Sequence, residues 1–163
     1  MPARRDLDFR SFDEISADVA ALATTPYTRC GNWDLATICD HLARTIEAGL
    51  DNQAVRFPIW LRVVAPVLGP VIFRRILKKR RFPTGVKAPA NLAPNESCDC
   101  ADAVARLNTA MTRAAGFRGP LSRHPIFGRA TVEQWQEAMM IHCAHHLSFL
   151  LPGEATYNAT RAN

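Results

Sequence analysis

The strongest constraint in the sequence is a helical repeat of apolar residues, which recurs in four segments. In each segment, apolar side chains return every three or four positions and therefore share one face of a helix. The clearest stripe consists of Leu35, Ile38, Leu42, Ile46 and Leu50. No segment alternates apolar and polar residues as a half-buried strand does. The chain is therefore expected to be all-α.

Residues that cap helix N-termini precede these segments. A capping box requires Ser or Thr followed three residues later by Glu or Gln, and a lone Asp or Asn can also cap. The candidates are Ser11 with Glu14, Asn32 or Asp34, Asp99, and Thr131 with Gln134. The last helix is expected to stop at Pro152 and Gly153, which cannot continue it.

Composition fits one soluble domain. The chain has 163 residues, of which 48% are hydrophobic and 21% charged, which is enough apolar material for a core and excludes a disordered chain. We expect a single domain over residues 1–153 and a flexible polar tail over residues 154–163. The basic N-terminus is not followed by an apolar stretch, so no secretory signal is predicted.

The five cysteines favour a reducing compartment. They are odd in number and show no repeated spacing, so free thiols and a cytoplasmic location are predicted. The closest pair, Cys98 and Cys100, has no second pair to complete a structural zinc site, and none is predicted there.

The middle of the chain departs from the helical repeat. Residues 57–73 form an apolar run that contains Pro66, Gly69 and Pro70, and residues 74–81 add six basic side chains. The run is shorter than the ~20 residues of a membrane span. Two interpretations stay open: a buried, Pro-kinked helix with a solvated basic end, or an interfacial anchor on an anionic membrane. No nucleic-acid partner is predicted, because aromatic residues are not interleaved with the basic ones.

The last predicted helix carries two histidines on its apolar side. His142 and His146 are one turn apart and differ by only ~40° around the helix axis. They continue a stripe formed by Trp135, Met139 and Phe149, so both are expected to point inward. Buried imidazoles need partners. A shared metal ion and ordinary hydrogen bonds are the two alternatives.

A third ligand would come from the remaining histidines. His41 adjoins the apolar stripe of the second helix and can reach the centre, whereas His124 lies in a loop beside Pro125 and is the lesser candidate. His145 is rotated ~100° from His146, so we expect it on the helix surface or at a pocket edge, as a hydrogen-bond donor or base. Three neutral imidazoles with open positions are typical of a reactive metal site rather than a closed structural one.

Other polar residues near these histidines are not assigned a role. Asp40 adjoins His41 but points ~100° away from it, and Glu137 lies off the inward stripe. Cys39 and Cys143 are interpreted as small packing residues, because no basic neighbour activates either thiol.

Two stretches together resemble the DinB/YfiT-like superfamily of metalloenzymes, in particular a bacterial branch of unknown function. They are "GNWDLATICDHLA" and "HPIFGRATVEQWQEAMMIHCAHHLSFL", and the likeness extends from the first helix to about Pro152. The resemblance implies an up-and-down four-helix bundle with zinc, nickel or iron at His41, His142 and His146. Relatives transfer or isomerise groups using low-molecular-weight thiols. The extra Pro-kinked apolar segment is a departure from the pattern.

The resemblance and the histidines lead to a functional hypothesis. We expect a metal-dependent enzyme without a nucleic-acid partner, which acts on a small molecule by thiol S-transfer or hydrolysis, with His145 as the candidate catalytic residue. The alternative is a non-catalytic helical bundle that uses residues 57–81 for homodimer formation or for contact with a membrane surface.

Overall fold

The computed structural model describes residues 4–53, 59–85, 89–95, 97–124 and 126–153, and for residues 59–67 and 90 it describes the backbone alone. The elements in chain order are α1 (Phe12–Thr24), β1 (Tyr27–Arg29), α2 (Leu35–Leu50), α3 (Ile59–Lys79), the short 3-10 helix η1 (Ala90–Leu92), α4 (Cys100–Gly116), α5 (Val132–Leu147) and β2 (Leu150–Pro152). The tail predicted for residues 154–163 lies outside the described residues.

Caps fix where the first two helices begin. The Ser11 hydroxyl accepts a hydrogen bond from the Glu14 backbone N–H, as predicted. The Glu14 carboxylate accepts from the N–H of Arg10 instead of Ser11, so the reciprocal half of the box is shifted by one residue. At α2 the cap is Asp34, whose side chain accepts from the N–H of Thr37.

The later two helices begin as predicted. The Asp99 carboxylate accepts from the N–H groups of the first turn of α4. At α5 the Thr131 and Gln134 side chains each accept from the other's backbone N–H, which completes a capping box. Each such cap stabilises a helix by about 0.5–2 kcal/mol.

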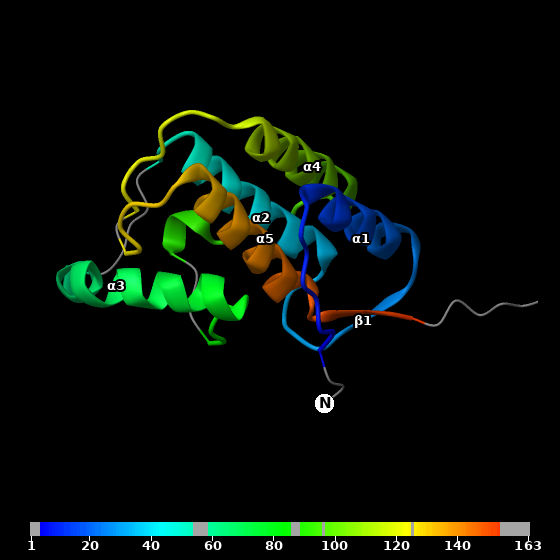
Figure 1. The fold of residues 1–163 in the computed structure, drawn as a ribbon. Helices are drawn as coiled ribbons and strands as arrows, with labels where there is room; N and C mark the ends of the chain where they lie inside the picture. The colour runs from blue at the N-terminus through cyan, green and yellow to red at the C-terminus, as the bar shows by residue number, and fades with distance from the viewer. Residues whose placement is uncertain (1–3, 54–58, 86–88, 96, 125, 154–163) are drawn as a thin grey trace, which may run out of the picture.

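One hydrophobic core is shared by α1, α2, α4 and α5, which lie against one another in Figure 1. The predicted α2 stripe is buried throughout, and the α1 and α4 stripes contribute Ile15, Val19, Leu22, Leu107 and Met111. Small residues, such as Ala110 on α4 and Ala144 on α5, also belong to this core. The expectation of a helical fold is confirmed.

A small sheet corrects the expectation of an all-α chain. β1 and β2 pair antiparallel, with Tyr27 opposite Pro152 and Arg29 opposite Leu150. Consequently α5 ends at Leu147, five residues before the predicted stop. Strands of three residues are too short for an alternating pattern to identify them in the sequence.

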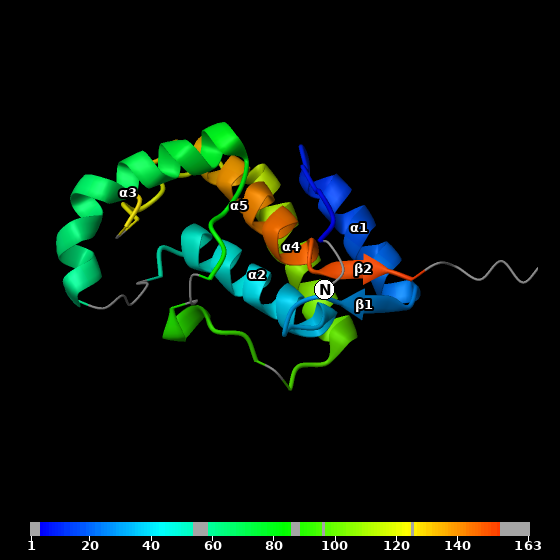
Figure 2. The same cartoon turned by 90° about the horizontal axis from the view of Figure 1, so that it is seen from below.

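Helix α3 lies outside the shared core and packs against α5. Figure 2 shows that its backbone is strongly curved, and Pro66 and Pro70 lie within it. A proline inside a helix removes a backbone hydrogen bond and bends the axis. The prediction of a kinked helix is therefore confirmed.

The prediction that this helix is buried is correct for one face only. Phe73 and Ile76 are buried, whereas Leu68, Val71 and Ile72 are between 42% and 61% exposed.

The loop before α5 packs under the inner face of α3. A Cβ atom at position 69 would lie 1.7 Å from the carbonyl oxygen of Ile126, so this close backbone approach requires Gly69. Phe73 stacks on Phe127, with ring centroids 5.4 Å apart. Ile126 and Phe127 thus pack against α3, and their loop forms part of a cavity wall.

Candidate metal centre

Three histidines from two helices converge beneath α3. His41 comes from α2, and His142 and His146 come from successive turns of α5. One ring nitrogen from each lies within 4.8 Å of the other two. The predicted meeting of these three side chains, separated by about a hundred positions in the chain, is thus observed in the fold.

A backbone carbonyl determines the protonation of His41. Its Nδ1 lies 2.8 Å from the carbonyl oxygen of Leu92 in η1. A carbonyl only accepts hydrogen bonds, so Nδ1 carries the proton and Nε2 keeps its lone pair. Metal-binding histidines commonly donate their second N–H in this way, which fixes the tautomer and the ring orientation.

The two histidines of α5 face each other directly. The Nε2 atoms of His142 and His146 are 2.9 Å apart. In a hydrogen bond between them, one Nε2–H donates to the lone pair of the other Nε2, so the two rings cannot both be charged. Ligands bound to one ion at Zn–N distances of about 2.0–2.1 Å and angles of 90–110° are about 3 Å apart. The observed separation therefore suits two ligands of one ion with little movement.

Burial keeps the three imidazoles neutral. It lowers the pKa of His41, against the opposing effect of the hydrogen bond to Leu92. It also lowers the pKa of His142 well below its usual value and that of His146 to about 2, and repulsion between the neighbouring imidazoles acts in the same direction. Neutral imidazole is the form that binds metal.

The face of α5 that carries the histidines lines a cavity instead of the core. The residues of α5 that join the shared core are Cys143, Ala144 and Leu147. The predicted stripe is offset from these and borders open space, which explains how a core-like helix face tolerates imidazoles.

Most members of the predicted stripe line that cavity. Trp135 and Met139 do so together with the two histidines. Phe149 does not, because α5 has already ended; its ring instead packs against His145 and lies under the guanidinium of Arg4. The expectation that Phe149 shares the inward stripe of His142 and His146 is wrong for this reason.

The cavity has a volume of about 280 Å³ and mainly apolar walls. This is near the lower limit of small-molecule sites, ~300–1,000 Å³. Its walls come from α2, the loop before α5, α5 itself, and the chain that leaves α3. The space beside the three histidines can therefore hold a small molecule.

Aromatic rings cover the histidine cluster. The Trp33 ring stacks on His146, with centroids 5.3 Å apart and planes 14° from parallel, and it also contacts His41. On the other side, the ring centroid of Phe82 lies 5.0 Å from that of His142. No sequence pattern selects Phe82, because it lies in a Pro-rich loop with no helical period.

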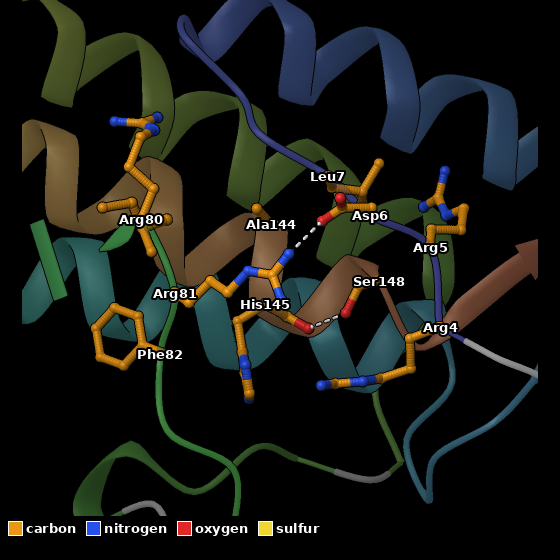
Figure 3. Close-up of a pocket in the computed structure, with 11 residues that line it drawn as sticks. Arg4, Arg5, Asp6, Leu7, Arg80, Arg81, Phe82, Ala144, His145 and Ser148 are labelled. Atoms are coloured by element: carbon orange, nitrogen blue, oxygen red, sulfur yellow. Dashed lines mark hydrogen bonds and ion pairs between the residues drawn. The ribbon is translucent and has the colours of Figure 1, made fainter. Parts of the chain in front are cut away.

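His145 lies at the edge of the cavity, between it and a neighbouring pocket. It lines the histidine cavity and also a neighbouring pocket of about 240 Å³. Figure 3 shows its ring projecting from α5 between Phe82 and Arg4. Burial and the charge of Arg4 lower the pKa of His145, and its ring meets His146 edge-on at 5.0 Å. Of the two predicted positions, the pocket edge is the one observed.

The neighbouring pocket is lined by arginines, most of which are paired. Arg5 forms a two-point ion pair with Asp18, and Arg81 pairs with Asp6 (Figure 3). Arg80 binds Asp8 on the N-terminal segment. It also binds Glu137 on α5, at 2.6 Å. These contacts tie the N-terminal segment and the end of α3 to the bundle.

His124 does not join the cluster. Its Nδ1 accepts hydrogen bonds from the N–H groups of Ile126 and Phe127, and its ring stacks on Phe127. Burial lowers the pKa of His124 to about 4. It borders the same cavity but organises the loop before α5.

Asp40 contributes to the site indirectly, through hydrogen bonds and ion pairs outside the histidine cluster. Burial raises the pKa of its carboxyl, but hydrogen bonds from Arg44 and from the Asn95 N–H outweigh this and leave the pKa below its usual value. Arg106 of α4 also pairs with it, at 2.9 Å. Because Asn95 follows η1, Asp40 helps to hold the segment whose Leu92 carbonyl orients His41.

The cysteines take no part in the cluster. Cys39 and Cys143 are buried in the core, and burial raises the pKa of both thiols, that of Cys143 to about 12. They are packing residues, as predicted. No described cysteine joins a group of converging metal-ligating side chains.

In the part of the chain that the structure describes, no helix has the length and apolar character needed to cross a membrane. This holds for α3, whose apolar run ends in a basic turn.

Comparison with known proteins assigns the chain to a family but finds no individual relative. No curated protein and no solved structure matches the chain. Residues 1–153 match the model of a family described as "Protein of unknown function (DUF1569)". This match covers all the helices and all three converging histidines, and the chain belongs to that family.

Proposed function

We propose that the protein is a metal-dependent enzyme of DinB-like type, in which His41, His142 and His146 hold one divalent ion. The observation that supports this most strongly is the convergence of three neutral imidazoles at the wall of a mainly apolar cavity. The 2.9 Å separation of two Nε2 atoms suits a shared ion. The proton on Nδ1 of His41 leaves its Nε2 free for the same purpose.

The donor set leaves the choice of metal open between zinc, nickel and iron. Imidazole nitrogen suits all three. Three protein ligands leave positions for water or substrate, as in catalytic sites rather than structural ones. When bound, the ion would supply Lewis acidity, lowering the pKa of a water molecule or of a substrate thiol.

The cavity would select a small substrate and limit access of water. Trp33 and Phe82 cover the histidines from two sides, and Met139 adds apolar wall. A largely apolar surround strengthens electrostatic interactions between the site and its substrate. We propose that the substrate is a small molecule, with a low-molecular-weight thiol as the first class to examine.

Two reaction classes fit this site, thiol S-transfer and hydrolysis. In S-transfer, the thiol sulfur forms a bond to an electrophilic carbon while the leaving group departs with its electron pair. The thiol proton passes to a base. In hydrolysis, the oxygen of water forms the bond to the electrophilic carbon, the leaving group again departs with its electron pair, and the proton of water passes to the same base. We assign this proton transfer to His145, which is neutral, borders the cavity and contacts His146.

The proposal can be tested with untagged protein loaded separately with zinc, nickel or iron. One assay follows the reaction of small thiols with an aryl chloride, and the other follows hydrolysis of a nitrophenyl ester. We expect at least one rate to require metal in the wild type and in His124→Asn, and to be lost in His142→Ala. Rates that are equal in all three proteins, with every metal, would contradict the proposal.

A further inference from the structure

The outer face of α3 joins an apolar patch to a row of cations. Leu68, Val71 and Ile72 are the exposed large hydrophobic residues among those described, with exposed fractions of 51%, 61% and 42%. All three fall on one side of the helix, because their spacings are three and four residues. Phe73 and Ile76, on the side of α3 that turns toward the bundle, are buried.

The cations continue the same face toward the C-terminal end of α3. Arg75 follows Val71 by four residues, and Lys78 and Lys79 follow Arg75 by three and four. All three are exposed, and no described carboxylate forms an ion pair with any of them or with Arg74. The arginines that follow the helix differ, since Arg80 and Arg81 are both paired with acidic residues.

From this arrangement we propose that the outer face of α3 binds the surface of an anionic membrane. An exposed apolar strip would enter the headgroup region, and the adjoining unpaired cations would attract anionic lipids. The helix would lie along the surface, because it is not apolar enough to cross the bilayer. Docking would bring the cavity close to the lipid, since Phe73 on the inner face of α3 lines that cavity.

Charge argues against a second copy of this chain as the occupant. In a symmetric dimer each patch meets the same patch of its partner. Such a dimer would bring the cations of both α3 helices into one interface without supplying an acidic partner, and unneutralised like charges in an interface oppose association. A membrane that carries anionic headgroups offers both an apolar phase and the opposite charge.

The test is co-sedimentation of the full chain with two kinds of vesicle, one of phosphatidylcholine alone and one containing about 30% phosphatidylserine. We expect binding to the anionic vesicles only, with strong weakening by salt. Arg75→Gln/Lys78→Gln/Lys79→Gln should reduce the partition coefficient by about 100-fold, given about 1 kcal/mol per cation. Leu68→Gln/Val71→Gln should also reduce it.

Two controls make the result specific. Arg10→Gln/Arg29→Gln/Arg118→Gln removes the same charge from exposed positions elsewhere and should bind nearly as well as the wild type. His146→Ala should also bind normally, so failure of the metal site and failure of docking are distinguishable.

Three outcomes would overturn the proposal. One is equal loss of binding in both charge variants, and another is no binding to anionic vesicles at low salt. The third is lipid-independent dimer formation that Leu68→Gln/Val71→Gln abolishes, because it would assign the face to a second copy. Circular dichroism of each variant checks that it is folded, and these exposed substitutions should leave the spectrum unchanged.

Discussion

The histidine cluster and His124 border the same cavity, yet their ring nitrogens have different partners. Burial lowers the pKa in both places, to about 4 for His124 and to about 2 for His146. At His124 the ring Nδ1 accepts hydrogen bonds from two backbone N–H groups of its own loop. In the cluster, nitrogens from separate turns and separate helices point at one another. The direction of the lone pairs, more than burial or a shifted pKa, distinguishes a candidate metal site.

The largest effect should come from removing one ligand. His142→Ala or His146→Ala should lower metal affinity by more than about 100-fold, exceeding the 10–100-fold typical of losing a residue that only orients a ligand. His124→Asn should leave the affinity unchanged. Isothermal titration of metal into the apo forms measures all three. A loss of metal affinity in His124→Asn as large as in the cluster variants would show that His124 also contributes to metal binding.

Metal removal should destabilise only proteins that bind metal. At a free metal concentration of about 100 times Kd, binding stabilises the folded state by about 2.7 kcal/mol, or roughly 5–10 °C in Tm. A chelator should therefore lower the Tm of the wild type and of His124→Asn by that amount. His146→Ala should melt at the same temperature with or without chelator, as followed by scanning calorimetry. An equal shift in His146→Ala would mean that the ion binds elsewhere.

Substitution of the supporting carboxylate should have an intermediate effect. Asp40→Asn removes the charge that Arg44 and Arg106 pair with and weakens the contact to the Asn95 N–H. We expect a loss of about 2 kcal/mol in the free energy of unfolding, since a largely buried ion pair is broken. Metal affinity should fall by about 10-fold through the loosened orientation of His41. Urea denaturation and metal titration measure the two effects separately.

The smallest effect should be a difference in acid sensitivity. The pKa of His124 is about 4 in the folded protein and about 6.5 in the unfolded chain, so acidification protonates the unfolded state first. The stability that neutral His124 contributes is therefore fully present above pH 6.5 and is lost as the pH falls toward 4. His124→Asn keeps an acceptor for the two N–H groups but cannot titrate. At pH 5.5 the wild type should lose about 1 kcal/mol more than this variant.

That difference is read from urea denaturation of the chelated proteins at pH 7.5 and 5.5. Chelation removes the metal, whose release in acid would otherwise add to the change. Parallel losses in the two proteins would show that His124 titrates normally.

The comparison also shows which parts of the site the sequence can predict. Helical spacing identified His142 and His146 as a pair, because two residues one turn apart must share a face. The apolar stripe of α2 brought His41 to the edge of the same interior. No pattern could identify the Leu92 carbonyl, since every residue has one and only the fold of η1 directs it at His41.

For the fold, too, local features could be predicted and features that depend on distant contacts could not. Capped amphipathic helices are local features, and the predictions for α1, α2, α4 and α5 were accurate at their N-termini. The β1–β2 pair depends on a contact across more than a hundred positions, and three-residue strands carry no local signal. The two faces of α3 also differ because of contacts that are distant in the sequence. Phe73 stacks on Phe127, whereas Val71 is 61% exposed.

The central claim is that the three converging histidines bind one metal ion. Its most direct test is elemental analysis of the untagged wild-type protein after supplementation with zinc, nickel and iron. The account predicts about one equivalent of metal in total per chain, and close to none in His142→Ala. A wild-type content below about 0.2 equivalents after supplementation would contradict it.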